Sequence, residues 1–185
     1  MPKNQNIEQV LKKVLIELMH SVDADKISVK DVAQKANISR ASFYRYYNSI
    51  DDILQSIEDE FIEGMRDCSR YYISTPINIH KLGQPYPSFI QIAEFLSGHK
   101  EEFLVLTGFH GDARFVSRFK KLIKEFYCGK IAFEGIITDN VDVYIEFVIA
   151  GNISAIRYWL EKKPNMKPED IAPVIQRMLY GPLVC

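Results

Sequence analysis

The stretch SVKDVAQKANISRASFYRYYNSIDDIL, residues 28–54, contains two short helical segments on either side of an Asn-Ile-Ser corner. Ser28 is placed to cap the first helix, and Ser39 is placed to cap a second helix over about residues 40–46. Asn37 lies where the chain must turn through a left-handed conformation, which Asn tolerates better than most other residues. Two helices joined by so short a corner predict a helix-turn-helix motif.

The second of these helices carries polar and aromatic side chains that a core does not need. We expect Arg40, Ser42, Tyr44 and Arg45 on its outward side, while Phe43 turns back to pack on neighbouring helices. An arginine can bind guanine edges in the major groove, and hydroxyl and basic groups can bind phosphate oxygens. A solvated basic face is the simpler alternative, because helix-turn-helix shapes are common in all-α proteins.

Charge is distributed unevenly along the chain, although its formal net value is only −1. Residues 1–50 contain eight Lys or Arg and five Asp or Glu, and the remaining residues contain 15 and 19. The N-terminal quarter is therefore a basic region on a mildly acidic protein, which favours a nucleic-acid partner for that region.

Composition limits the class of protein. The chain has 185 residues, of which 47% are hydrophobic, enough for one large core or two small domains. Cys68, Cys128 and Cys185 are far apart and odd in number, which argues against a disulfide framework. There is no apolar signal region and no run of 18 apolar residues. We therefore expect a cytoplasmic protein that is neither exported nor membrane-spanning.

Helical periodicity extends through most of the chain. Pro and Gly concentrate in residues 73–87, which predicts a loop and a boundary region there. The β-branched sequence VDVYIEFVIA looks strand-like, but it continues for more than 20 residues, and that length favours a helix. The expected helices cover about residues 7–19, 29–36, 40–46, 51–65, 88–97, 99–108, 112–127, 140–162 and 168–180.

Residues 26–54, KISVKDVAQKANISRASFYRYYNSIDDIL, resemble the DNA-binding region of the TetR family of bacterial transcriptional regulators. The family pattern has a Thr- or Ser-opened helix, an I-A-x-x-A-G-V-S turn, a Y-x-Y/H-F segment and a following s-K-x-x-L helix. The similarity covers about residues 7–55. Two positions depart from it, because Asn37 replaces the turn glycine and Ile50 replaces a lysine that usually binds a phosphate.

In that family the recognition helix and its tyrosines contact operator DNA. The resemblance therefore implies contacts from Ser28, Ser39, Ser42, Tyr44 and Tyr46, to which the residues themselves add basic side chains. The predicted DNA-binding residues are Ser28, Lys30, Ser39, Arg40, Ser42, Tyr44, Arg45 and Tyr46.

The C-terminal part is similar to a subset of the same family. The matching segments are HGDARFVSRFKKLI, AGNISAIRYWLEKK and KPEDIAPVIQRML. The resemblance implies a homodimer in which the last two helices form a four-helix bundle, with Gly151, Ser154 and Ala155 allowing close approach. We thus expect an all-α protein with an N-terminal three-helix helix-turn-helix domain over residues 1–50, a connecting helix over 51–72, and a helical ligand-binding and dimerisation domain over 73–185.

A small apolar or aromatic inducer is a further expectation, since the middle of the chain is rich in aromatic side chains. The same side chains fill ordinary cores equally well, and core packing is the simpler role for Trp159. The predicted pocket residues are Phe95, Phe103, Leu106, Phe109, Phe115, Phe119, Phe147 and Trp159.

Catalytic chemistry has little support in the sequence. His99, Glu102 and His110 do not form an H-E-x-x-H motif, and no G-x-S-x-G, phosphate-loop or dinucleotide motif occurs. We therefore predict no cofactor, no metal and no enzyme. The sequence favours a ligand-responsive repressor that binds a palindromic double-stranded DNA operator as a homodimer. The alternative is a co-regulator of the same fold that acts through a protein partner.

Overall fold

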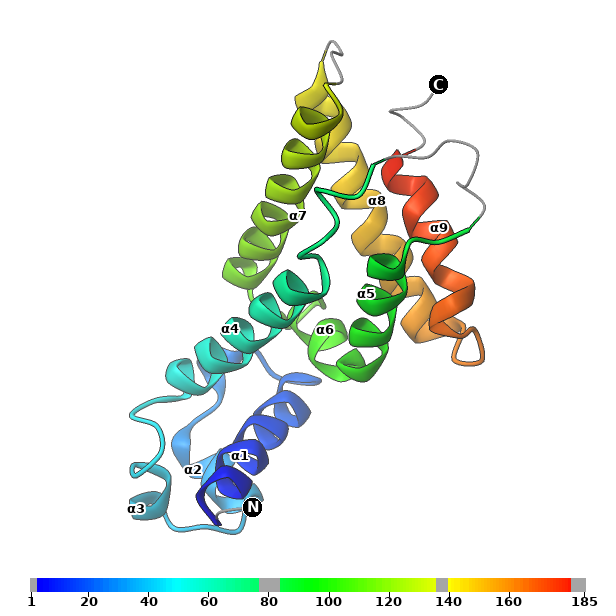
Figure 1. The fold of residues 1–185 in the computed structure, drawn as a ribbon. Coiled ribbons are helices and arrows are strands. Elements are labelled where there is room, and N and C mark those ends of the chain that lie inside the picture. The colour runs from blue at the N-terminus through cyan, green and yellow to red at the C-terminus, as the bar shows by residue number, and fades with distance from the viewer. Residues whose placement is uncertain (1–2, 77–83, 136–139, 181–185) are drawn as a thin grey trace. The chain divides into compact units, whose positions relative to one another are not determined.

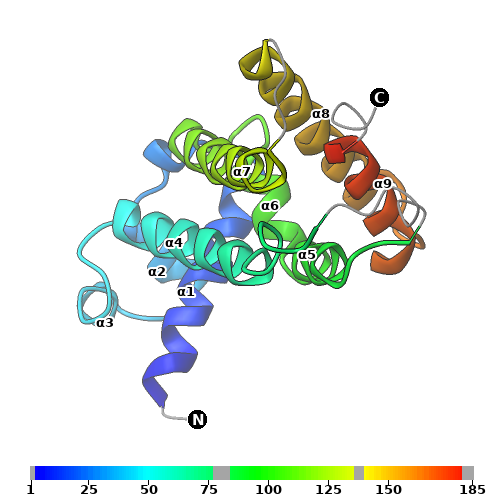
Figure 2. The ribbon, with the colours of Figure 1, turned by 45° about the horizontal axis from the view of Figure 1, so that its top comes forward.

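The structure is a computed structural model that describes residues 3–76, 84–135 and 140–180. All regular elements within those ranges are helical, which confirms the predicted fold class (Figures 1 and 2). The helices are α1 (Lys3–Met19), the short 3-10 helix η1 (Ala24–Lys26), α2 (Val29–Lys35), α3 (Arg40–Phe43), α4 (Ile50–Cys68), α5 (Pro87–Gly98), α6 (Lys100–Leu106), α7 (Ala113–Glu134), α8 (Val141–Lys162) and α9 (Pro168–Tyr180).

The helices form two compact units that do not follow chain order. Unit 1 comprises Met1–Phe61 and Glu101–Val116, and unit 2 comprises Ile62–Lys100 and Ser117–Cys185. Residues 101–116 thus belong with the N-terminal helices, which the order of elements along the chain does not indicate. The sequence predicted functional domains that end at residues 50 and 72. Those two boundaries stay a prediction.

In unit 1, α1 packs on α2 and α2 packs on α3. The ring of Phe61 in α4 lies 6.0 Å from that of Phe103 and 5.4 Å from that of Phe115, so α6 and the start of α7 share the core with α4. The other buried apolar residues of this core include Leu11, Leu15, Met19, Val32, Ala33, Phe43, Ile53, Leu54, Ile57 and Leu106.

Caps define both helices of the helix-turn-helix, as the sequence predicted. The Ser28 side chain accepts a hydrogen bond from Asp31 N, and Asp31 Oδ2 accepts one from Ser28 N at 2.9 Å, so both halves of a capping box are present. Ser39 Oγ accepts from Ser42 N at 3.0 Å. Asn37 has φ 54°, in the left-handed region. These bonds satisfy backbone donors that each helix start leaves open.

The helix after the corner is shorter than the periodicity suggested. It ends at Phe43, and the chain continues in turns, with Arg45 N donating to Ser42 O and Tyr46 N donating to Phe43 O. Both hydrogen bonds join residues three apart, as in a 3-10 helix. This tighter pattern ends the α-helical pattern, in which bonded residues are four apart. Tyr44 and Arg45 therefore lie just after α3.

In unit 2, α5 and α8 both pack on α9. The β-branched sequence at 141–150 is helical, as its length predicted. The prediction ended α7 near residue 127, but it continues to Glu134, where Lys130 is fully buried and donates to the carbonyl oxygens of Ile73 and Thr75. No helix among the described residues is long and apolar enough to cross a membrane.

Candidate DNA-binding surface and ligand cavity

A single buried ring anchors the candidate recognition helix. Phe43 is 0% exposed, whereas Tyr44, next in the chain, is 55% exposed and Arg40 and Arg45 are also exposed. The rings of Phe43 and Tyr44 meet edge to face with centroids 5.5 Å apart. One aromatic residue therefore fixes α3 to unit 1, and its neighbour presents a phenol hydroxyl to the outside.

Short-range hydrogen bonds organise the polar side chains of this segment. Ser39 Oγ donates to Ser42 Oγ at 3.1 Å, and Arg45 Nη2 donates to the same Ser42 oxygen at 3.2 Å. The guanidinium of Arg45 is thereby held along α3, which limits the rotamer entropy it would lose on binding. Ser42 itself is half-buried, so its hydroxyl acts here as a positioning group.

The start of α2 contributes to the same surface. Ser28 and Lys30 are exposed, and the Ser28 hydroxyl donates to Asp31 at 2.5 Å. Hydrogen bonds from Ser28 hold the pKa of Asp31 below its usual range, and the positive charges of Lys30 and Arg40 lower it further. Lys30 of α2 and Arg40 of α3 thus both act on the carboxylate of Asp31.

The start of α4 completes the surface. Ile50 is the first residue of α4 and is half-buried. Asp52 N donates to Ser49 Oγ at 3.1 Å, and hydrogen bonds from Ser49 and Asn48 lower the pKa of Asp52. Asp51 pairs with Arg114 at 2.5 Å. Both acidic residues at this helix start therefore already have partners within unit 1.

The eight predicted DNA-binding residues thus lie at the N-caps of α2 and α3, within these two helices, or in the turns that follow α3. Tyr46 is half-buried, so its ring contributes to packing as well as to the surface. Three exposed cations, namely Lys30, Arg40 and Arg45, stand among serine and tyrosine hydroxyls. Such a surface can bind phosphates and offer guanidinium groups to base edges.

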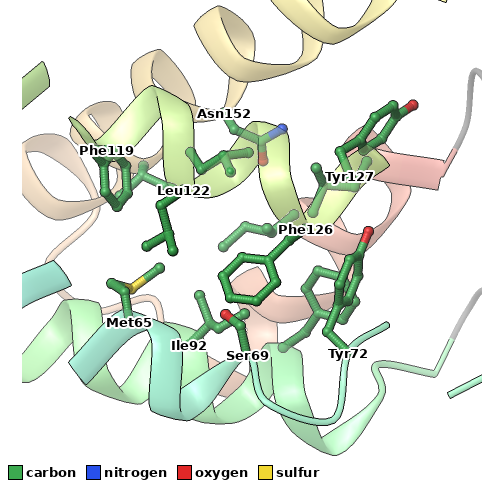
Figure 3. Close-up of a pocket in the computed structure, with 14 residues that line it drawn as sticks. Met65, Ser69, Tyr72, Ile92, Phe119, Leu122, Phe126, Tyr127 and Asn152 are labelled. Atoms are coloured by element: carbon green, nitrogen blue, oxygen red, sulfur yellow. The ribbon is translucent and has the colours of Figure 1, made fainter. Parts of the chain in front are cut away.

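Unit 2 contains a cavity lined by residues of four helices, α5, α7, α8 and α9, together with the end of α4 and the turns that follow it (Figure 3). It encloses about 570 Å³ of empty space, counting the part that is open to solvent. Burial raises the pKa of Tyr127 to about 12, so its phenol is neutral at physiological pH. The lining residues are Met65, Ser69, Tyr72, Phe89, Ile92, Phe119, Leu122, Ile123, Phe126, Tyr127, Asn152, Ile156, Ile175 and Leu179.

Of the eight residues predicted to line a pocket, Phe119 lies at this cavity. The core of unit 1 takes in Phe103, Leu106 and Phe115 instead. The other four are also elsewhere. Phe95 stacks on His99 with ring centroids 4.1 Å apart, and Trp159 Nε1 donates to Met166 O at 2.9 Å. Phe109 is 96% exposed and Phe147 is 71% exposed. Aromatic content indicates burial in general, but it does not say which unit or face a ring occupies.

Sequence reasoning missed the polar members of the lining. Asn152 is buried within α8, among Ile145, Val148, Ile149 and Ile156. A single amide on an otherwise apolar helical face was the available signal, because a buried amide needs hydrogen-bond partners. Ser69, which follows the end of α4, gave no comparable signal.

The outer face of α8 carries a row of exposed apolar side chains. Val143, Phe147 and Tyr158 are exposed, and Ala150 and Ser154 lie between them at helical spacing. Gly151 is half-buried, and a Cβ built on it would lie 3.6 Å from Met178 in α9, an ordinary contact distance. Large apolar side chains left in water along one helix are typical of a surface that another chain covers.

A helix-turn-helix with an exposed basic second helix, joined to a helical unit that holds an apolar cavity, defines the class of DNA-binding transcriptional regulators. Residues 13–57 match the family described as "Bacterial regulatory proteins, tetR family", and residues 83–181 match a "Transcriptional regulator C-terminal region" of TetR type. The chain belongs to the TetR family of transcriptional regulators, which are not enzymes.

Individual relatives are more distant. The "Uncharacterized HTH-type transcriptional regulator YxbF" of Bacillus subtilis is 22% identical over 178 residues, which are 95% of this chain and 45% of that protein. The "HTH-type dhaKLM operon transcriptional activator DhaS" of Lactococcus lactis is 36% identical over 73 residues, 39% of each chain. The chain therefore spans less than half the length of the curated relatives it matches.

Solved structures share the fold. A putative TetR-family regulator from Syntrophomonas wolfei has a TM-score of 0.69 at 14% identity, covering 99% of this chain and 97% of that one. The structure of DhaS has a TM-score of 0.58 at 19% identity and covers 96% of both chains. At these identities the likeness concerns the fold alone.

Proposed function

We propose that this regulator is a ligand-responsive repressor that binds a two-fold symmetric DNA operator as a homodimer. The observation that carries the proposal is the surface around α3, where Arg40, Tyr44 and Arg45 are exposed beside a buried Phe43. A helix of this length reaches few bases, so a specific site requires two copies about one turn of duplex, 34 Å, apart.

The exposed row on α8 supports the homodimer. Burying Phe147, Tyr158 and Val143 against a second copy would remove three exposed apolar side chains of α8 from water. The small residues Ala150 and Ser154 between them leave room for a partner helix to approach. The cavity of unit 2 supports the ligand, because its walls are apolar and carry a few neutral polar groups, as in many small-molecule sites.

Activation is a second candidate, and one observation favours it. DhaS, the relative with 36% identity over 73 residues, is described as a transcriptional activator. The sign of regulation depends on where the operator lies relative to the promoter. A reporter fused to the native promoter, with and without the regulator, decides between the two.

The DNA-binding proposal is tested by a mobility shift with the DNA upstream of the regulator's own gene. We expect a specific complex whose affinity falls steeply with salt, since counterions are released from each contacted phosphate. Footprinting is expected to show a two-fold symmetric site. A folded protein that shifts no fragment at low salt would favour the alternative in which the helix-turn-helix contacts a protein partner.

A further inference from the structure

The cavity of unit 2 has apolar walls and only neutral polar groups. None of its lining residues is Asp, Glu, Lys, Arg or His. The nearest buried cation on α7, Lys130, is already engaged with the carbonyl oxygens of Ile73 and Thr75 and pairs with Glu134 at 2.8 Å. A charged ligand in the cavity would therefore lose its hydration without gaining a counter-charge.

An amide oxygen of the cavity lining lacks the partner that its burial requires. Asn152 is 2% exposed, and its Nδ2 donates to Val148 O at 2.8 Å within α8. That bond fixes the orientation of the amide, because only the nitrogen can donate. Oδ1 is then left without a hydrogen-bond partner among the described residues. Buried acceptors of this kind are rare in folded proteins.

The direction of this oxygen links it to the cavity. In Figure 3, Asn152 Oδ1 lies on the side of the amide that faces Leu122 and Phe126. The hydroxyl of Ser69 also points toward Phe126, from the end of α4. The Tyr127 hydroxyl likewise lacks a partner among the described residues, but it points away from Phe126. The cavity thus presents one fixed acceptor and one hydroxyl that can donate or accept.

We propose that the cavity binds a neutral aromatic or alicyclic molecule that donates a hydroxyl or N–H hydrogen bond to Asn152 Oδ1. The proposal rests on the proposed function in that it treats this cavity as the ligand site, and it specifies the ligand's chemistry. Carboxylates are rejected, because an anion would face the Asn152 oxygen in an apolar space. Hydrocarbons of the same shape would leave that oxygen unpaired.

Three size-matched probes test this chemistry by calorimetry on the full chain without DNA: 2-naphthol, 2-methylnaphthalene and 2-naphthoate. We expect 2-naphthol to bind about tenfold more tightly than 2-methylnaphthalene, because only the naphthol satisfies the buried acceptor. The naphthoate should bind about a hundredfold more weakly than the naphthol. Equal affinities for naphthol and methylnaphthalene, or tightest binding of the naphthoate, would overturn the proposal, as would the absence of binding by all three.

Two variants test whether the preference for 2-naphthol over 2-methylnaphthalene comes from Asn152. Asn152→Leu removes the acceptor and keeps the branched arrangement of side-chain heavy atoms, so the tenfold preference for 2-naphthol should disappear while 2-methylnaphthalene still binds. Tyr127→Phe is the matched control, since it also removes a buried polar atom of the lining, but one that points away from Phe126. It should keep the preference. If Asn152→Leu does not fold, the three probes on the wild-type chain decide alone.

The same probes added to the mobility-shift assay separate this inference from the proposed function. Selective binding of 2-naphthol without any change in DNA binding would support the ligand chemistry and contradict a ligand-responsive regulator. DNA binding with no probe bound would contradict the inference and leave the DNA-binding function standing.

Discussion

At the scale of the residue, two adjacent aromatic side chains differ sharply in burial. Phe43 is fully buried, and Tyr44 is mostly exposed with its ring against the edge of Phe43. A tyrosine that only packed would not need its hydroxyl. We therefore propose that the hydroxyl of Tyr44 contacts DNA and that the ring of Phe43 stabilises the fold, and substitutions can separate these two roles.

Tyr44→Phe removes only the hydroxyl. If this hydroxyl binds a phosphate, operator affinity should fall by about 1 kcal/mol at an unchanged melting temperature. Phe43→Ala creates a cavity and should lower the stability of the fold by about 3 kcal/mol. Fluorescence anisotropy with operator DNA and thermal melting measure the two effects. Equal losses of melting temperature in both variants would place Tyr44 in the core and contradict its role at DNA.

Ile50 is the second residue whose role can be tested singly, because the TetR pattern has a phosphate-binding lysine there. Ile50→Lys places a cation at the start of α4, where Asp51 already pairs with Arg114 and Asp52 with Ser49. A cation at a helix N-terminus interacts unfavourably with the helix dipole, and this should lower the free energy of unfolding by about 0.3 kcal/mol. Operator binding should tighten, and the slope of log affinity against log salt should steepen by about 0.9 per contact, or about 1.8 per dimer.

A salt titration of wild type and Ile50→Lys on one operator measures this slope, with folding checked by circular dichroism. Ile50→Gln is the matched control, because it has a polar side chain of similar length without the charge. An unchanged slope in folded Ile50→Lys would mean that position 50 does not face DNA, and the assignment of α3 as the reading element would have to be revised.

At the scale of the element, the caps show why the helix-turn-helix could be predicted from sequence and the cavity could not. Ser28, Ser39 and Asn37 act on backbone within a few residues, so the local sequence determines what they do. The cavity and the position of residues 101–116 depend on which helices meet, and periodicity alone does not contain that information. For this reason the predicted boundaries of most helices are close to those observed, while seven of the eight predicted pocket residues lie elsewhere.

The capping box of α2 has a pH dependence whose sign follows from Asp31. Hydrogen bonds from Ser28 lower the pKa of Asp31 in the folded chain. A depressed pKa contributes stability above the unfolded value of about 3.9, and that contribution is lost as pH falls through the folded value. Asp31→Asn should therefore be less stable than wild type at pH 7, and the difference should shrink as pH falls below about 4.

Urea unfolding of both proteins between pH 7 and pH 3 measures this difference. Histidines and other carboxylates titrate in both chains, so their contributions cancel. Asp25→Asn is a suitable control, because Asp25 lies in η1, outside the capping box. A stability difference between wild type and Asp31→Asn that stayed constant over the whole range would mean that the Asp31 carboxylate charge does not stabilise α2.

At the scale of the whole molecule, the proposed function requires more than one chain. Unit 1 has one short candidate recognition helix, α3, and unit 2 has a row of exposed apolar side chains on α8. The first limits how many bases one copy can contact, and the second is a surface that water solvates poorly. Dimerisation through α8 would provide two copies of α3 for one operator. It would also bury the exposed apolar row on α8. Loss of the dimer should then weaken operator binding even though α8 belongs to unit 2 and the helix-turn-helix belongs to unit 1.

Phe147→Ser tests this link. Phe147 is 71% exposed in the chain, so its replacement should leave the fold of the monomer intact. If Phe147 anchors the proposed interface, Phe147→Ser should cost about 2 kcal/mol of dimerisation free energy, or roughly 30-fold in the dimer dissociation constant. Sedimentation equilibrium should show a larger share of monomer, and operator affinity should fall in parallel. Phe109→Ser is the control, because Phe109 is 96% exposed but belongs to unit 1. If both variants sediment like the wild type, the row on α8 is not the dimer interface, and the two-fold operator would need a different pairing of chains.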